Sequence, residues 1–117
     1  MSDVFLTDRA LDNVEEIYQY SVAEWGERVA DKYLIDFDTA INSLKLNPGL
    51  LKLKTPISNR FKAFRVNNHF LICETTDNKI FVLTVLHTSM DALRRLSDLQ
   101  PYLEAECEVL YQRIRKK

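Results

Sequence analysis

Three apolar runs separated by two-residue turns limit the folds of this chain more than any other feature. The runs lie at about 61–66, 69–75 and 79–86 and are rich in β-branched and aromatic residues. Asn67-Asn68 and Asp77-Asn78 stand between them, and Asn and Asp tolerate the left-handed backbone that two-residue hairpins need. The runs therefore predict an antiparallel meander of three strands.

Two-residue turns also set the register of the predicted strands. The expected pairs are Val66 with His69, Phe64 with Leu71, Cys73 with Val82, and His69 with Leu86. One face of the sheet then carries Phe64, Val66, Leu71, Val82 and Leu86. The other face carries Phe61, Phe70, Ile72, Phe81, Leu83 and Val85. Because both faces are apolar, both need a cover, from helices of this chain or from a partner chain.

The residues before the meander predict a short strand and two helices. Val4-Phe5-Leu6 is the strand, and apolar residues then recur at three- and four-residue steps from Ala10 to Trp25 and from Val29 to Leu44. Gly26 separates the two helices, so they must fold back as a hairpin, and Asn47-Pro48-Gly49 ends the second. The same spacing leaves one aromatic residue of the hairpin, Tyr20, exposed and turns three to the core: Tyr18, Trp25 and Tyr33.

The C-terminal part of the chain is the candidate cover for the second face of the sheet. Ser89 can cap a short helix that ends at Leu96, and a second helix is predicted from about Leu99 to Arg115, with Pro101 in its first turn. Residues 50–60 are predicted as a loop, with or without a short extended piece.

Taken together, these elements predict one α+β domain, residues 1–117. An N-terminal strand and a helical hairpin pack on a small antiparallel β-sheet, and residues 98–117 form a C-terminal helical extension. A chain of 117 residues with 46% apolar composition suits one core of modest size. No run is long enough to span a bilayer, and the first residues lack the pattern of a signal peptide, so a cytoplasmic protein without membrane contact is expected.

Charge and cysteine content restrict the function. Residues 1–47 hold four Lys or Arg against ten Asp or Glu, whereas residues 48–79 hold six against two. Because a protein that grips nucleic acid is usually basic overall, we expect no sequence-specific nucleic-acid binding by this chain alone, although its middle part is basic. Cys73 and Cys107 are interpreted as small apolar side chains, and neither a metal site nor a cofactor is predicted.

Two motifs in the strand region resemble one known family. Phe64-Arg65-Val66-Asn67-Asn68-His69 and Val85-Leu86-His87-Thr88-Ser89-Met90-Asp91 are similar to the F-R-V-x-x-H strand and the V-L-H-x-x-M-D strand-to-helix exit of the ParE branch of the RelE/ParE toxin superfamily. The resemblance implies a toxin of a type II toxin–antitoxin system, neutralised by a cognate antitoxin, which inhibits growth by binding DNA gyrase. ParE-like chains generally end soon after the second motif, so the last twenty or so residues depart from the family pattern.

Given that function, the sequence offers two sets of binding residues. Candidates for contact with the target are the basic side chains Arg60, Lys62, Arg65, His87, Arg94 and Arg95. Candidates for contact with the antitoxin are the apolar side chains Phe61, Phe70, Ile72, Phe81 and Leu83.

Two alternatives remain open at this point. RelE-type relatives cut messenger RNA on the ribosome, and Arg65, Glu74 and His87 share a face in the predicted register, where they could supply a phosphate clamp, an acid and a base. The competing interpretation is an ion pair between Arg65 and Glu74 across the strands. We favour a binding protein over this enzyme. The second alternative is a relative that has lost toxicity and only sequesters an antitoxin.

Overall fold

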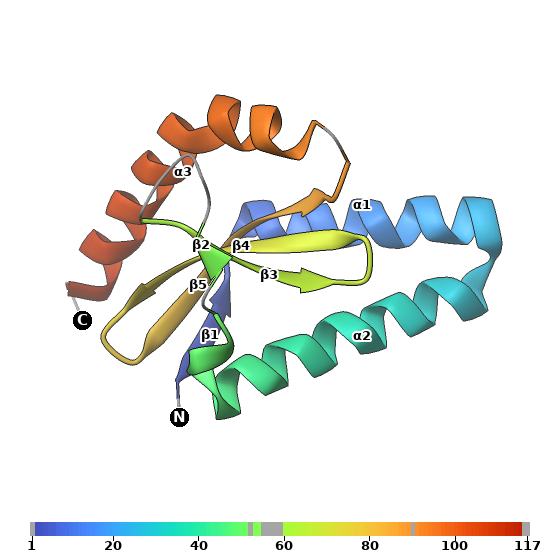
Figure 1. Ribbon diagram of the computed structural model, residues 1–117, viewed down its shortest axis with the longest axis horizontal. Helices are drawn as coiled ribbons and strands as arrows, with labels where there is room; N and C mark the ends of the chain where they lie inside the picture. The colour runs from blue at the N-terminus through green and yellow to red at the C-terminus, as the bar shows by residue number, and fades with distance from the viewer. Residues whose placement is uncertain (1, 52, 55–59, 90, 116–117) are drawn as a thin grey trace.

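The fold is one mixed β-sheet with helices on both faces. The computed structural model describes residues 2–51, 53–54, 60–89 and 91–115. In these residues the sheet has five strands in the order β1-β5-β4-β3-β2 (Figure 1). Along the chain the elements are β1 (Asp3–Leu6), α1 (Asp8–Trp25), α2 (Glu27–Leu46), the 3-10 turn η1 (Pro48–Leu50), β2 (Leu53–Lys54), β3 (Lys62–Val66), β4 (His69–Thr76), β5 (Lys79–His87) and α3 (Ala92–Arg115).

The predicted α+β class and its helical hairpin are confirmed, with one difference in the sheet. β1 pairs with β5 in parallel, with Val4 beside Ile80, so the sheet is mixed rather than wholly antiparallel. In the predicted loop 50–60, Leu51 is buried in the core and Leu53–Lys54 pairs with β3. Residues 55–59 of that loop lie outside the described residues, as does Met90 in the second family-like motif.

The helical hairpin covers one face of the sheet. Thr7 starts α1, because its hydroxyl oxygen accepts the Ala10 N–H at 3.1 Å and its O–H donates to the Leu83 carbonyl at 2.9 Å. Gly26 turns the chain between α1 and α2 with φ +91°, a backbone conformation that favours glycine. The core on this face includes the buried side chains Ala10, Phe37, Leu44, Leu71, Val82 and Val85.

α3 covers the other face of the sheet. Leu96, Leu103 and Cys107 of α3 form a second core with side chains of β3, β4 and β5. Two helices were predicted here, and that prediction is wrong, because one helix runs through Pro101. Proline removes one backbone hydrogen bond from a helix interior and bends it, and Figure 1 shows α3 changing direction as it follows the sheet. Burial of α3 residues on both sides of Pro101 compensates for the missing bond.

The two predicted turns are confirmed, and so is part of the register. Asn67 and Asp77 have φ of 53° and 50°. The pairs Val66 with His69, Phe64 with Leu71, and Cys73 with Val82 form as expected.

The predicted pairing of His69 with Leu86 is wrong, because β5 contains a β-bulge. Ile72 pairs with Thr84 but Cys73 pairs with Val82, so the register skips Leu83. Beyond the bulge the two faces are exchanged, which puts Val85 on the hairpin face and Leu86 on the α3 face. Among the described helices, none combines the length and apolar composition that a bilayer span requires.

Candidate functional site

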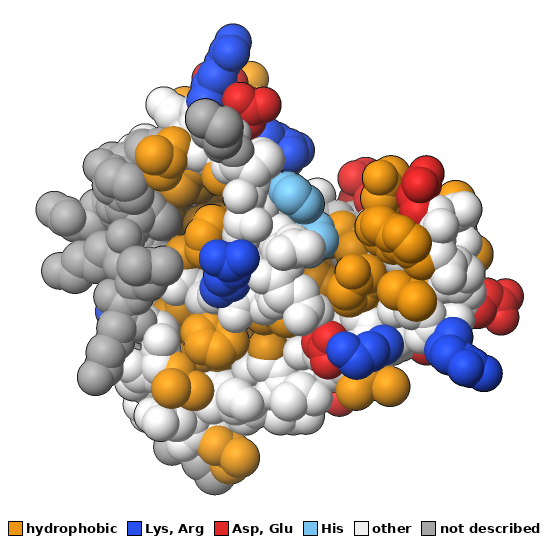
Figure 2. Space-filling view, turned by 45° about the vertical axis from the view of Figure 1, so that its right-hand side comes forward, with side chains coloured by type: hydrophobic (Ala, Val, Ile, Leu, Met, Phe, Trp, Pro, Cys, Tyr) orange, Lys and Arg blue, Asp and Glu red, His pale blue; other side chains and the backbone are white. Residues whose placement is uncertain are grey.

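A groove of about 490 Å³ lies where the helical hairpin passes the end of the sheet. We call it the hairpin groove. α1 forms one wall, Val85 and the two histidines of the chain lie along the sheet end, and Arg95 reaches it from α3. In Figure 2 the histidines border a cluster of hydrophobic side chains on the projecting hairpin. The groove therefore combines residues from both helical layers with the end of β4 and β5.

His69 and His87 form a cross-strand pair in the hairpin groove. Their ring centroids are 5.2 Å apart and the rings meet edge to face, while the His69 ring lies 6.0 Å from that of Phe37. Burial lowers the pKa of His69 to about 4, and the charge of His87 adds to the effect. His69 is therefore neutral at pH 7. His87 is exposed at the end of its strand.

Asn13 explains why β5 departs from the predicted register. Its side-chain oxygen accepts the backbone N–H of Val85 at 3.0 Å and the hydroxyl of Thr84 at 2.7 Å. A bulge disrupts the hydrogen bonds of the ladder, and Asn13 supplies the acceptor that one displaced N–H needs. This contact between α1 and β5 places His87 on the same face as His69.

Three aromatic side chains at the far end of the hairpin form what we call the aromatic tip: Tyr20, Trp25 and Tyr33. The Trp25 ring meets Tyr20 at 5.7 Å and Tyr33 at 6.3 Å, both edge to face. Trp25 is 54% exposed and Tyr20 60%. The prediction that Trp25 faces the core is therefore wrong. Helical spacing identified the correct face of α1, but at this point the hairpin has passed the end of the sheet, as Figure 1 shows.

The predicted target-binding residues fall into two groups. Arg65 and His87 lie at the ends of β3 and β5 beside the β3–β4 turn, on opposite faces of the sheet, and Arg94 and Arg95 lie in the first turn of α3. We call these four the basic corner. The turn is joined to the corner because the Thr88 N–H donates to the Asn68 carbonyl at 2.8 Å. In the described part of the chain, no carboxylate forms an ion pair with these three arginines. Arg60 and Lys62 lie elsewhere, at the other end of β3.

The structure does not bring the three nuclease candidates together. Glu74 pairs with Phe81, and His87 is six residues further along β5, about 20 Å away, on the opposite face of the sheet. Arg65 pairs with Phe70, and its guanidinium donates to the Asn67 carbonyl at 3.0 Å. Neither the predicted catalytic group nor the competing ion pair between Arg65 and Glu74 is present.

Glu74 belongs instead to a network that holds α3 against the sheet. Arg60 forms an ion pair with Glu74 and bonds Glu108 of α3 at 3.2 Å, while the Tyr111 hydroxyl donates to Glu74 at 2.6 Å. Burial raises the pKa of Glu74, but hydrogen bonds from Arg60, Cys107 and Tyr111 outweigh it, so that the pKa lies below its ordinary value. Glu74 is thus an ionised structural group.

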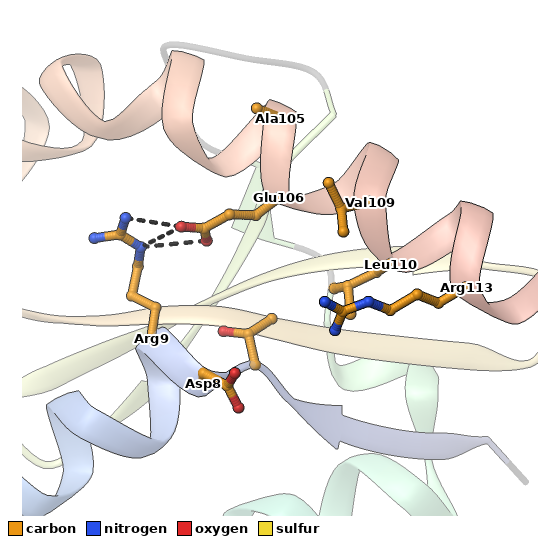
Figure 3. Close-up of a pocket in the computed structure, with 8 residues that line it drawn as sticks. Asp8, Arg9, Ala105, Glu106, Val109, Leu110 and Arg113 are labelled. Atoms are coloured by element: carbon orange, nitrogen blue, oxygen red, sulfur yellow. Dashed lines mark hydrogen bonds and ion pairs between the residues drawn. The ribbon is translucent and has the colours of Figure 1, made fainter.

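The predicted antitoxin-binding residues are covered by α3 of the same chain. Four of them are buried, namely Phe61, Ile72, Phe81 and Leu83, and Phe70 is partly buried. A second contact holds α3 from the side of α1, in a pocket of about 320 Å³. There Arg9 reaches up to Glu106 and forms a two-point ion pair, with 2.8 Å between Nη2 and Oε1 (Figure 3).

Sequence reasoning missed three parts of this site: the bulge, the exposed aromatic tip and the place of His69 in the groove. The position of Trp25 next to Gly26, at the turn of the hairpin, is the one local signal for exposure. Among the described residues, no three His, Cys, Asp or Glu side chains are grouped closely enough to hold a metal ion.

Comparison with known proteins identifies similar chains over the hairpin and the sheet. The model of the family described as ParE toxin of type II toxin-antitoxin system, parDE, matches residues 4–92. Toxin ParE of Escherichia coli is 25% identical over 99 residues, which cover 84% of this chain and 96% of that protein. Toxin ParE1 of Mycobacterium tuberculosis (strain CDC 1551 / Oshkosh) is 29% identical over 96 residues, which cover 81% of this chain and 98% of that protein.

The fold also occurs among solved structures. A chain of the chromosomal ParDE TA system from P. aeruginosa aligns with a TM-score of 0.67 at 14% identity, and the alignment covers 76% of this chain and 98% of that chain. The family match ends at residue 92, where α3 begins. Apart from Arg95, the residues that line the hairpin groove lie within the match, and so do Arg65 and His87 of the basic corner, whereas almost all of α3 lies beyond it.

Proposed function

Because the chain belongs to the ParE toxin family of type II toxin–antitoxin systems, we propose that it arrests growth by binding DNA gyrase in the cytoplasm and that a cognate antitoxin neutralises it. The basic corner is the observation that supports the target contact. Its arginines are exposed and pair with no carboxylate of the described residues, so their charge is available to a partner. Unpaired surface cations speed association with an acidic or DNA-bearing target.

The separation of the acid–base candidates supports binding rather than chemistry. A nuclease needs its base, acid and phosphate clamp around one scissile bond. Here Glu74 is ionised within the α3 network, and His87 is about 20 Å away on the other face of the sheet. A gyrase poison needs no such group.

Because α3 covers the predicted antitoxin-binding residues, we propose a different contact surface for the antitoxin. The apolar face with Phe61 and Phe81 is closed by α3, whereas the hairpin groove is open. We therefore place the antitoxin in the hairpin groove, where it can bury the exposed aromatic tip and reach the edge of the basic corner.

The experiment is a reaction of the purified chain with DNA gyrase, ATP and plasmid, scored for supercoiling and for linear DNA after detergent and protease. We expect linear DNA to accumulate. Arg94→Ala and Arg95→Ala should each raise the half-inhibitory concentration by roughly two- to tenfold, as expected for one interface cation. Lys79→Ala is the control, because it removes a cation from the opposite end of β5.

No effect on gyrase at concentrations where the folded protein arrests growth would contradict the target. The ribosome would then be the next target to test, with cleavage of messenger RNA as the measurement. A chain that binds its antitoxin but does not arrest growth would contradict toxicity itself.

A further inference from the structure

The hairpin groove has an aromatic end and a basic end, and this difference carries an inference that rests on the proposed antitoxin contact. We propose that the aromatic tip binds a Lys or Arg side chain of the antitoxin, and that Arg95 and His87 at the other end bind a carboxylate. The partner is thus an amphipathic helical segment with a cation at one end of its apolar face and an acid at the other.

The length of the groove sets the spacing of those charges. α1 lines it from Asn13 to Trp25, a rise of about 18 Å at 1.5 Å per residue. Between the ends, the lining includes Ile17 and Val85, which suit an apolar helix face. A helical segment of about three turns matches this length.

The aromatic tip is suited to a cation. Trp25 and Tyr20 are more than half exposed, and their mutual edge contacts hold the rings in place while leaving aromatic surface open. Residues 20–33, which contain the tip, hold three acidic side chains against two basic ones. Glu16 also lines the groove, but along α1 it is about 13 Å from Trp25 and about 5 Å from Asn13, so it lies nearer the other end. The attraction of aromatic faces for cations is therefore the main reason to expect a cation at the tip.

The opposite end is suited to an acid. Arg95 and His87 are both exposed there, and Arg95 forms no ion pair with the carboxylates of the described residues. Guanidinium groups bind carboxylates through two parallel hydrogen bonds, which fixes orientation as well as position. Since Asn68 also lines this end, its side-chain amide can add a hydrogen bond.

The probe is a fluorescein-labelled, alanine-based helical peptide of fourteen residues. It carries one Arg and one Glu eleven residues apart, about three helical turns and therefore on one face, with two Leu between them. Matched peptides replace the Arg by Gln or the Glu by Gln. Fluorescence anisotropy measures the dissociation constant of each peptide for the full chain and for its variants.

The expected result is a pair of local couplings. Replacing the peptide Arg should weaken its binding to the unchanged protein by about three- to fivefold. The same replacement should weaken binding to the Trp25→Leu or Tyr20→Leu variant by less than about twofold. Replacing the peptide Glu should weaken binding to the unchanged protein and to Trp25→Leu alike, and should have little effect with Arg95→Gln. Tyr102→Leu, which removes an exposed aromatic ring of α3, is the control and should leave both couplings intact.

The proposal would be overturned if the peptide change and the protein change weakened affinity independently, so that their fold-changes in dissociation constant multiply. It would also be overturned if no binding were seen up to about 1 mM peptide. Trp25 is exposed, so its replacement should leave the circular dichroism spectrum unchanged, and Tyr20→Leu gives a second measurement of the same coupling. Failure here is distinct from failure of the proposed function, because the gyrase reaction contains no peptide. If the peptide charges couple to the groove residues but the chain does not inhibit gyrase, the proposed groove contact stands and gyrase is rejected as the target.

Discussion

Arg9 of α1 and Glu106 of α3 form an ion pair with three hydrogen bonds, two from the guanidinium to Oε1 at 3.1 Å and 2.8 Å and one to Oε2 at 3.3 Å. The two residues are distant in sequence, and Glu106 lies outside the family match. Together with the Glu74 network, this contact attaches α3 to the remainder of the domain at two places.

The Arg9–Glu106 pair should contribute modestly to stability. Its side chains are 32% and 36% exposed, so solvent screens their attraction, and we expect a coupling of about 0.5–1 kcal/mol. A double-mutant cycle with Arg9→Ala and Glu106→Ala in urea unfolding measures it. The Lys32–Asp36 pair, with 3.8 Å between its atoms, is the comparison and should give a smaller coupling. Equal couplings for the two pairs would contradict the prediction.

Loss of Glu74 should be more costly. Its side chain is 9% exposed and accepts bonds from Arg60 and Tyr111, so Glu74→Gln removes the buried charge that the partly exposed guanidinium of Arg60 faces. We expect a decrease of about 2–4 kcal/mol in the free energy of unfolding, against about 1–2 kcal/mol for Tyr111→Phe. Urea unfolding measures both. A change below about 0.5 kcal/mol for Glu74→Gln would mean that the network contributes little.

Glu74 should also make stability depend on acid pH. Its folded pKa lies below its ordinary value, so the stabilisation is present above about pH 4.3, the pKa of an unfolded Glu, and is lost as the pH falls through the lower folded pKa. The difference in unfolding free energy between the unchanged protein and Glu74→Gln should therefore shrink as the pH falls below that value. A difference that stays constant with pH is the contrary outcome.

His69 should oppose folding in mildly acidic solution. Its folded pKa of about 4 lies below 6.5, so between these values the unfolded chain binds a proton that the folded chain does not, and stability falls as the pH is lowered. His69→Gln should flatten this dependence. In His87→Gln, loss of the neighbouring charge should raise the pKa of His69, which NMR titration of its ring proton measures. An unchanged pKa would leave burial as the whole cause.

Leu103 tests whether α3 is part of the core or a surface attachment. It is completely buried between α3 and the sheet, and Leu103→Ala should lower the free energy of unfolding by about 2–5 kcal/mol. Tyr102→Ala, the next residue along and 63% exposed, should change it by less than about 0.5 kcal/mol. Similar small effects of both would show that α3 unfolds separately.

The elements that the sequence predicted well are those specified by neighbouring residues. Asn67 and Asp77 dictate their turns through their own backbone preferences, and the register follows from them as far as Cys73. The bulge depends on Asn13, which is 72 residues from Val85 in the chain, and no local pattern reveals such a contact.

The candidate site was less predictable because it depends on where elements end. Helical spacing shows which face of α1 is apolar, but not that the sheet stops before Trp25. The C-terminal segment was predicted as a cover for the second face of the sheet, and Leu103 and Cys107 are buried there. The continuity of α3 through Pro101 depends on burial on both sides of the proline, which is a tertiary effect.

The bulge at Leu83 determines the face of the sheet on which each later side chain of β5 lies, because it adds one residue to the alternation of the strand. Without it, His87 would face α3 and be separated from His69, and the groove would lose the exposed imidazole that lies at the same end as Arg95. A change of spacing inside the sheet therefore decides which side chains line this surface, and a substitution of Asn13 that restores regular pairing would remove His87 from the groove without replacing His87 itself.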